Sequence, residues 1–400
     1  MNNARRCVFS VIAGTVTGAL LSISASQLHA QPTPAVAVRA ENPLAIARRD
    51  ETISITWSAL ASKLPGAMAK AVRVRDNGSG REVPSQVIDS DGNGTPDLLV
   101  FQGNFEPKSV RLFSIEQGAP AAFAPRTFVR HDEPRDDIAW ESDRLAWRVY
   151  GQGLKKTSSA MSSSGVDIWV KKTHALVVQK WYDKGHDEYH VDTGEGADFY
   201  DVGETLGAGG TALWVNDSLH RADNFTAWKV VAMGPVRTIF ELEYPEWTAG
   251  PFKVSQTKRI SIDAGSNLYR EESVFRSTGA AREIPYVIGE LKRTGMVGTM
   301  SRTNTWAWLT GWGPTTPKKG GDGDIGTAVL LPRERVRDWK ETASHYLAVT
   351  SATPGVPVVH YVGAGWSLSG DFADVQAWWR YLDEFALRLA TPLVVTLGAP

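Results

Sequence analysis

The densest group of side chains suited to proton transfer lies between residues 181 and 210. The segment holds two of the seven histidines that follow residue 30, together with three tyrosines and several carboxylates. Histidine titrates near neutral pH, and a tyrosine can donate a proton to a leaving group. We expect His190 to act as a base and Glu195 to orient its ring. Tyr200 or Tyr189 is the expected acid.

His186 and His190 are four residues apart, which is also the spacing of paired metal ligands on a helix. Gly185 and Gly194 oppose a helix here, so a solvated loop histidine remains the alternative for His190. The glycines of this segment do not form a phosphate loop, because no Gly-Lys-Ser/Thr follows them. Their expected role is to let the backbone turn tightly beside a ligand.

A second polar group lies on predicted strands. Alternation over 144–150 and 166–171 places polar residues on one face and apolar residues on the other. This polar face is either a solvated surface or the floor of a cleft, in which cations meet an anionic sugar while an indole stacks on its ring. Residues 361–366 could add an aromatic wall. The expected substrate-binding residues are Arg148, Asp167, Trp169, Lys171, Tyr361 and Trp366.

Residues 89–97 resemble the first half of a calcium loop, with oxygen-bearing side chains at alternate positions and a glycine at the turn. The candidate ligands are Asp89, Asp91, Asn93 and Asp97. Val100 stands where a bidentate glutamate is expected, so a polar turn between two strands is the alternative. A structural calcium ion is therefore a possible cofactor, and the sequence identifies no other.

The elements that must position these residues are mostly strands. Short strands separated by turns predict a small β-sandwich module over 31–125. Longer alternating strands at 144–150, 166–171, 174–182, 227–233, 236–244, 255–263 and 268–275 predict a large antiparallel sandwich over 126–400. Helix signals are few, and the best begins at Asp374 and ends before Pro392, with a final strand at 393–397.

Residues 1–30 have the organisation of a secretory signal peptide. Arg5 and Arg6 precede an uncharged apolar stretch, and Ala30 offers a small residue before the expected cleavage point. Cys7 is the only cysteine, so the exported chain would lack thiols and disulfides. We expect a periplasmic or secreted protein without a membrane anchor.

The overall composition limits the partners. The formal net charge of −1 gives no basic field for nucleic acid. The 15 tryptophans in 400 residues hint at sugar binding, because indole rings stack on the apolar faces of pyranoses. The expected partner is an acidic oligosaccharide substrate.

Several segments together resemble domain-of-unknown-function family 4861 along essentially the whole exported chain. They are residues 136–151, 164–171, 189–196 and 361–366, with Ser142 where relatives are expected to have asparagine. The resemblance implies an exported bacterial protein associated with the breakdown of polysaccharides that contain uronic acids. It also implies a galactose-mutarotase-like β-supersandwich.

These expectations fit β-elimination, by a lyase or a dehydratase. The C5 proton of a uronide is acidic, and negative charge develops on the adjacent carboxylate, where Arg148 or Lys171 could bind. The alternatives are a glycoside hydrolase using Glu195 and Asp198, a non-catalytic carbohydrate-binding protein, and a mutarotase or epimerase.

Overall fold

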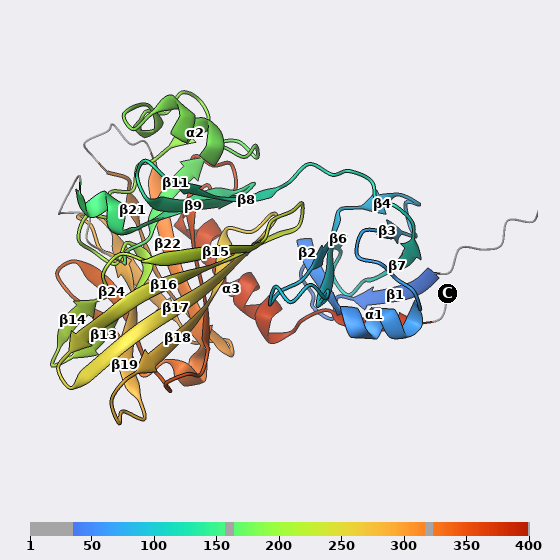
Figure 1. Ribbon diagram of the computed structural model, residues 1–400. Coiled ribbons are helices and arrows are strands. Elements are labelled where there is room, and N and C mark those ends of the chain that lie inside the picture. The colour runs from blue at the N-terminus through green and yellow to red at the C-terminus, as the bar shows by residue number, and fades with distance from the viewer. Residues whose placement is uncertain (1–34, 157–163, 317–322, 399–400) are drawn as a thin grey trace, which may run out of the picture. The chain divides into compact units, whose positions relative to one another are not determined.

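The computed structural model describes residues 35–156, 164–316 and 323–398. The predicted signal peptide lies outside this range. The described residues belong to one compact unit, residues 34–400. Within them, no helix is long and apolar enough to cross a membrane. Strands dominate the chain (Figure 1), which confirms the predicted all-β fold.

Two small sheets form around residues 35–117. The first has the order β26 (Val394–Gly398), β1 (Ala35–Glu41), β7 (Val110–Gln117), β3 (Val72–Asp76) and β4 (Glu82–Val83). The second has the order β2 (Arg48–Thr56), β6 (Leu98–Phe105) and β5 (Ser85–Ile88). Alternation on β1 directs Val36, Val38 and Ala40 toward an apolar core that the two sheets share. The last strand, β26, pairs with β1, so the end of the chain completes the sheet that its beginning started.

Three further sheets, one of eight strands and two of five, form the rest of the fold. The largest has the order β15 (Ala227–Ala232), β16 (Arg237–Ala249), β17 (Phe252–Asp263), β18 (Leu268–Ser277), β25 (Val358–Trp366), β22 (Asp324–Pro332), β21 (Trp306–Pro314) and β20 (Val297–Ser301). The second has the order β14 (Ser218–Arg221), β13 (Ala208–Val215), β19 (Ile284–Leu291), β24 (His345–Ala352) and β23 (Asp338–Glu341). The third has the order β12 (Gly196–Ala197), β11 (Asp167–Lys171), β10 (Leu145–Tyr150), β9 (Asp137–Ser142) and β8 (Thr127–Asp132).

One apolar core joins the three sheets. It includes Trp147 of the third sheet, Tyr286 of the second and Tyr269 of the eight-stranded sheet. Trp147 and Tyr269 meet edge to face, with ring centroids 5.4 Å apart. The inner face of the eight-stranded sheet is therefore covered by two other sheets, as a β-supersandwich requires.

Helices are few among the described residues. They are α1 (Trp57–Lys63), α2 (Val178–Lys184) and α3 (Val375–Ala390), with 3₁₀ turns η1 (Gln152–Lys156), η3 (Glu188–His190) and η5 (Arg333–Arg335). The predicted strand over 174–182 is wrong, because α2 occupies its second half. Val177, Val178, Trp181 and Tyr182 are buried at helical spacing and pack on the third sheet.

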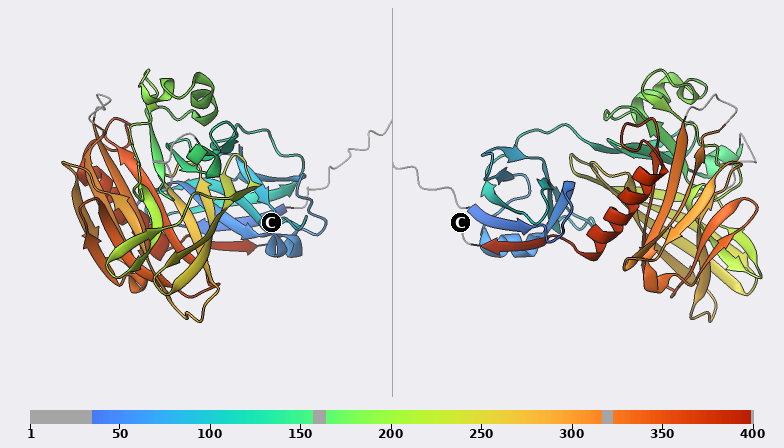
Figure 2. Two further views of the ribbon diagram at one scale, coloured as in Figure 1. Left: turned by 60° about the vertical axis from the view of Figure 1, so that its left-hand side comes forward. Right: turned by 180° about the vertical axis from the view of Figure 1, so that it is seen from behind.

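The C-terminal helix was predicted correctly and covers part of the outer face of the eight-stranded sheet (Figure 2). Asp374 caps it by accepting a hydrogen bond from the Ala377 N–H at 2.8 Å. Trp378 packs against the sheet and donates from Nε1 to Thr310 Oγ1 at 2.8 Å. The helix covers β21 and β22 and leaves the outward side chains of β16 to β18 beside it.

Candidate functional site

Arg148 on β10 is the centre of a buried ion network, which we call the Arg148 network (Arg148, Tyr150, Asp167, Tyr189, His190 and Asp198). Its guanidinium donates to Asp167 Oδ2 at 2.5 and 3.1 Å and to Asp198 Oδ2 at 3.0 Å. A further donor reaches the Tyr189 hydroxyl at 2.8 Å. Four expected site residues are thus brought together from three separate parts of the sequence.

The electrostatics of this network depend on its burial. Burial, reinforced by repulsion from Asp198, raises the pKa of Asp167 to about 7, although Arg148 opposes the change. Burial by itself would lower the pKa of Arg148, but the surrounding phenol and carboxylates raise it well above its ordinary value. Arg148 therefore stays charged, and Asp167 binds a proton more readily than an ordinary carboxyl does.

His190 has oxygen atoms beside both ring nitrogens. Nε2 lies 3.0 Å from Asp198 Oδ2, and Nδ1 lies 2.8 Å from the backbone carbonyl of His186. Both ring nitrogens therefore have a partner within the protein, and neither is directed toward a substrate. The expected orienting residue, Glu195, instead accepts from Lys180 at 2.7 Å, and Asp198 occupies the place beside the histidine. The geometry therefore does not support His190 as a base.

The expected cleft floor on β10 and β11 is covered by another layer. Asp167, Trp169 and Lys171 are buried because the segment containing α2 and η3 packs over this face. Lys171 Nζ donates to Glu141 Oε2 at 2.9 Å, and Trp169 stacks on Tyr189 with centroids 4.8 Å apart. These side chains hold the covering segment in place rather than line a cleft.

Other expected site residues also have structural surroundings. The Tyr200 ring is fully buried, so its hydroxyl is not accessible to a substrate, and burial also raises its pKa. Trp366 is buried and packs against Phe199, with ring centroids 6.0 Å apart, so it is not a free stacking wall. Neither side chain is placed as the sequence led us to expect.

The predicted calcium loop forms a tight polar turn. Carboxylate oxygens of Asp89, Asp91 and Asp97 lie within 4.8 Å of one another. Asp89 accepts hydrogen bonds from three backbone N–H groups of the same loop, and Asp97 accepts from Ser90. The carboxylates thus stabilise the turn itself, and calcium binding at this loop stays a prediction.

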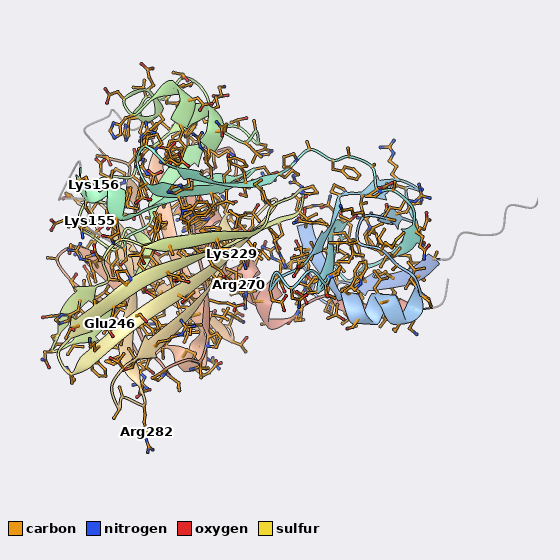
Figure 3. All side chains as sticks on the ribbon, in the orientation of Figure 1. Lys155, Lys156, Lys229, Glu246, Arg270 and Arg282 are labelled. Carbon is orange, nitrogen blue, oxygen red and sulfur yellow. The ribbon has the colours of Figure 1, made fainter. Side chains whose placement is uncertain are left out.

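An open groove lies on the outer face of the eight-stranded sheet. Its volume is about 830 Å³, within the usual range for ligand sites. Strand register places Ser261, Arg270 and Tyr361 side by side on β17, β18 and β25. Arg237 and Arg259 lie on β16 and β17 and also line the groove. We call this groove the sheet groove, and Figure 3 labels Arg270 on its floor.

Two further elements form its walls. Tyr381, Glu384, Phe385 and Arg388 line it from α3, at spacings that share one helix face. Residues 49–54 and Ser90 line it from the N-terminal sheets. The Ser90 carbonyl accepts from Arg259 Nη2 at 2.7 Å, which joins this wall to the floor.

Most carboxylates of the sheet groove are paired with arginine. Asp263 accepts from Arg237 at 2.5 and 2.7 Å, and Glu272 accepts from Arg270. Asp50 and Glu51 on the wall pair with Arg126 and Arg388, respectively. Each guanidinium has five N–H donors, so these pairs leave donors for a ligand. Glu384 is exposed on α3.

Tyr361 combines proton-transfer chemistry with access to the sheet groove. Burial raises its pKa, although the positive charge of Arg270 acts in the opposite direction. The phenol therefore keeps its proton at neutral pH. Phe385 contacts its ring edge to face, with centroids 5.3 Å apart. This position suits a proton donor better than a base.

Sequence reasoning identified Tyr361 but missed its partners on β16 to β18. The signal was present, because Arg259, Ser261 and Asp263 alternate with buried residues on β17. The same alternation occurs on β10 and β11, where the polar face is buried. Sequence alone gave no reason to prefer one polar face over the other.

Comparisons with known proteins agree with this fold. A curated relative, uncharacterized protein P7 of Formosa agariphila, is 29% identical over 379 residues, covering 90% of this chain and 93% of its own. A glycosyl hydrolase family 38 protein from Enterococcus faecalis has a TM-score of 0.51 at 10% identity over 92% of this chain. An α-mannosidase from Enterococcus faecalis V583 gives a TM-score of 0.49 at 10% identity, with coverage of 92% of this chain and 46% of its own.

The present chain spans about half the length of both solved structures, 48% and 46% respectively. At 10% identity the first of them supports the β-rich fold and nothing about the reaction. Family assignment comes instead from the match of residues 40–395 to the domain of unknown function DUF4861. That match covers most of the chain, so this protein belongs to the DUF4861 family.

Proposed function

We propose that this protein is an exported enzyme that acts on uronic-acid-containing oligosaccharides by β-elimination. The observation that carries the proposal is the adjacency of Arg270 and Tyr361 on the floor of an open groove. A guanidinium can bind the uronate carboxylate, and a protonated phenol can serve the leaving oxygen. The other arginine–carboxylate pairs on the floor of the groove offer both hydrogen-bond donors and acceptors to sugar hydroxyls.

The proposed reaction uses three groups. The Glu384 carboxylate takes the C5 proton, and the C5–H electron pair forms the C4–C5 double bond. Arg270 stabilises the negative charge that develops on the substrate carboxylate. The C4–O bond breaks, and the leaving oxygen takes the proton of Tyr361. Glu384 then returns a proton to the phenolate through solvent. A departing sugar makes the enzyme a lyase, and a departing hydroxyl makes it a dehydratase.

The pairing of the carboxylates favours elimination over hydrolysis. Hydrolysis in most glycosidase families needs two carboxyl groups, one of which must carry a proton. Asp263 and Glu272 are ion-paired with Arg237 and Arg270, so neither is a free acid or base. Glu384 is then the one carboxylate of the groove that can act as a base. A single carboxylate base, a phenol that donates a proton and a guanidinium that binds a carboxylate are the groups that β-elimination needs.

The test is a screen of uronide oligosaccharides read by mass spectrometry and near-ultraviolet absorbance. Elimination splits the substrate without added water, or removes one water from it, and creates an absorbing double bond. Tyr361→Phe should lower kcat by at least about 100-fold, since general acid catalysis contributes about 10² to 10⁴. Tyr346→Phe, a matched tyrosine outside the groove, should retain the rate. Products that gain one water, or full activity in Tyr361→Phe, would contradict the proposal.

A further inference from the structure

One tryptophan differs from the other fourteen in its exposure. All fifteen lie within the described residues, eight of them are buried, and Trp228 alone is exposed, with 43% of its surface accessible. It lies on β15, one of the two edge strands of the eight-stranded sheet, where residues 227–230 are all exposed. An exposed indole leaves a large apolar surface for a ligand to cover.

The ring of Trp228 is held in position from one side. His131 stacks on it, with centroids 4.8 Å apart and an interplanar angle of 26°. His131 is itself fixed by Asp136, whose Oδ1 lies 2.9 Å from the imidazole Nε2. Because His131 covers one ring face, the accessible surface of Trp228 belongs to the rest of the side chain. A ring positioned before binding loses little entropy when a ligand stacks on it.

The edge strand is protected against pairing with another strand. Lys229 stands in the middle of β15, and a bulge interrupts its register between Val230 and Ala232. A charged residue and a bulge are two of the devices by which natural edge strands avoid further strands. These features disfavour a peptide strand or a second β15 as the ligand, whereas the flat face of a sugar needs no backbone pairing.

The 3₁₀ turn η1 is linked to His131 through Asp136, whose Oδ2 accepts from the Gly153 N–H at 2.5 Å. This turn carries two lysines (Figure 3): Lys155 pairs with Asp223 at 2.6 Å, and Lys156 is exposed. Lys156 is therefore the cation that this turn offers to a carboxylate of a uronic-acid chain.

We propose that Trp228 is the stacking platform of a second carbohydrate-binding site, which takes one pyranose of an acidic polysaccharide. The platform is distinct from the sheet groove. Trp228 pairs with Leu242 of the apolar core, so it stands on the sheet face opposite to Arg270. Its role is to hold a long chain on the enzyme while the groove acts on another part. Only the choice of a uronic-acid polymer rests on the proposed function.

Affinity electrophoresis in gels that contain polygalacturonic acid tests this site. All proteins carry Arg270→Ala, so that the groove neither turns over the polymer nor dominates its retention. In this background Trp228→Ala should weaken binding about tenfold or more, because stacking and the covered apolar area are both lost. Val230→Ala, a matched exposed residue two positions along β15, should bind as the parent does. Trp228→Phe should keep part of the affinity.

Iodide quenching of tryptophan fluorescence gives an independent readout. Polymer should protect the most quenchable fraction in the parent, and this fraction should be missing in Trp228→Phe. Unchanged retention of Trp228→Ala, equal losses in Trp228→Ala and Val230→Ala, or no protection from iodide would overturn the platform. Equal retention in neutral dextran would overturn its preference for acidic chains. None of these outcomes depends on turnover, so failure of β-elimination would be seen separately.

Discussion

Replacing Asp167 by asparagine should remove a large pH dependence from the stability of this protein. Burial, with repulsion from Asp198, raises the pKa of Asp167 from an ordinary 3.8 to about 7 in the folded state. The folded protein therefore binds this proton more tightly than the unfolded chain does. The stabilisation from protonation is fully present below about pH 4 and is lost as the pH rises through 7.

The size of this effect follows from the two pKa values. A difference of one pKa unit corresponds to 1.36 kcal/mol, so the interval between 3.8 and about 7 is worth about 4 kcal/mol at most. That is a large share of the roughly 5–15 kcal/mol that stabilises a typical domain. Asparagine is neutral at every pH and still offers an oxygen to Arg148. The free energy of unfolding of Asp167→Asn should therefore lack this decline with rising pH.

Urea unfolding followed by tryptophan fluorescence at several pH values between 4.5 and 8.5 measures the effect. The wild-type free energy of unfolding should decline across this interval by several kcal/mol more than that of Asp167→Asn. A smaller decline should remain in both proteins, because burial also raises the pKa of Asp137, to about 6. Asp371→Asn is the matched control, since Asp371 pairs with Arg144 at the surface at 2.9 Å. If Asp167→Asn declined as steeply as wild type, the reasoning about the Arg148 network would be wrong.

Two further predictions concern the elements that support the site. Lys171→Met should lower the free energy of unfolding by about 3–5 kcal/mol, because it leaves the buried Glu141 side chain without its cation. Adding Glu141→Gln should restore part of that loss in the same urea assay, and no recovery would contradict the ion-pair explanation. Asp374→Ala should cost about 1 kcal/mol by removing the cap of α3. A change below the error of the unfolding measurement would show that the cap does not contribute.

The sequence by itself determined which segments form strands and helices. It determined much less about which segments pack against one another. Period-two alternation identified β10, β11, β17 and β18, and helical spacing after Asp374 identified α3. The same reasoning misread 174–182, because adjacent valines fit either a strand or the buried side of a short helix. These features are local, so they can be read from a few consecutive residues.

Tertiary structure decided which polar face is available to a ligand. Arg148 and Lys171 occupy alternating polar positions just as Arg259 and Arg270 do, but α2 and η3 cover the first pair. The second pair faces a groove whose walls come from α3 and from strands near the start of the chain. Alternation in the sequence shows that a strand has one polar and one apolar face. Only packing between distant segments determines whether the polar face is covered or open. The candidate site therefore lies on the outer face of the eight-stranded sheet and not in the histidine-rich loop that the sequence suggested.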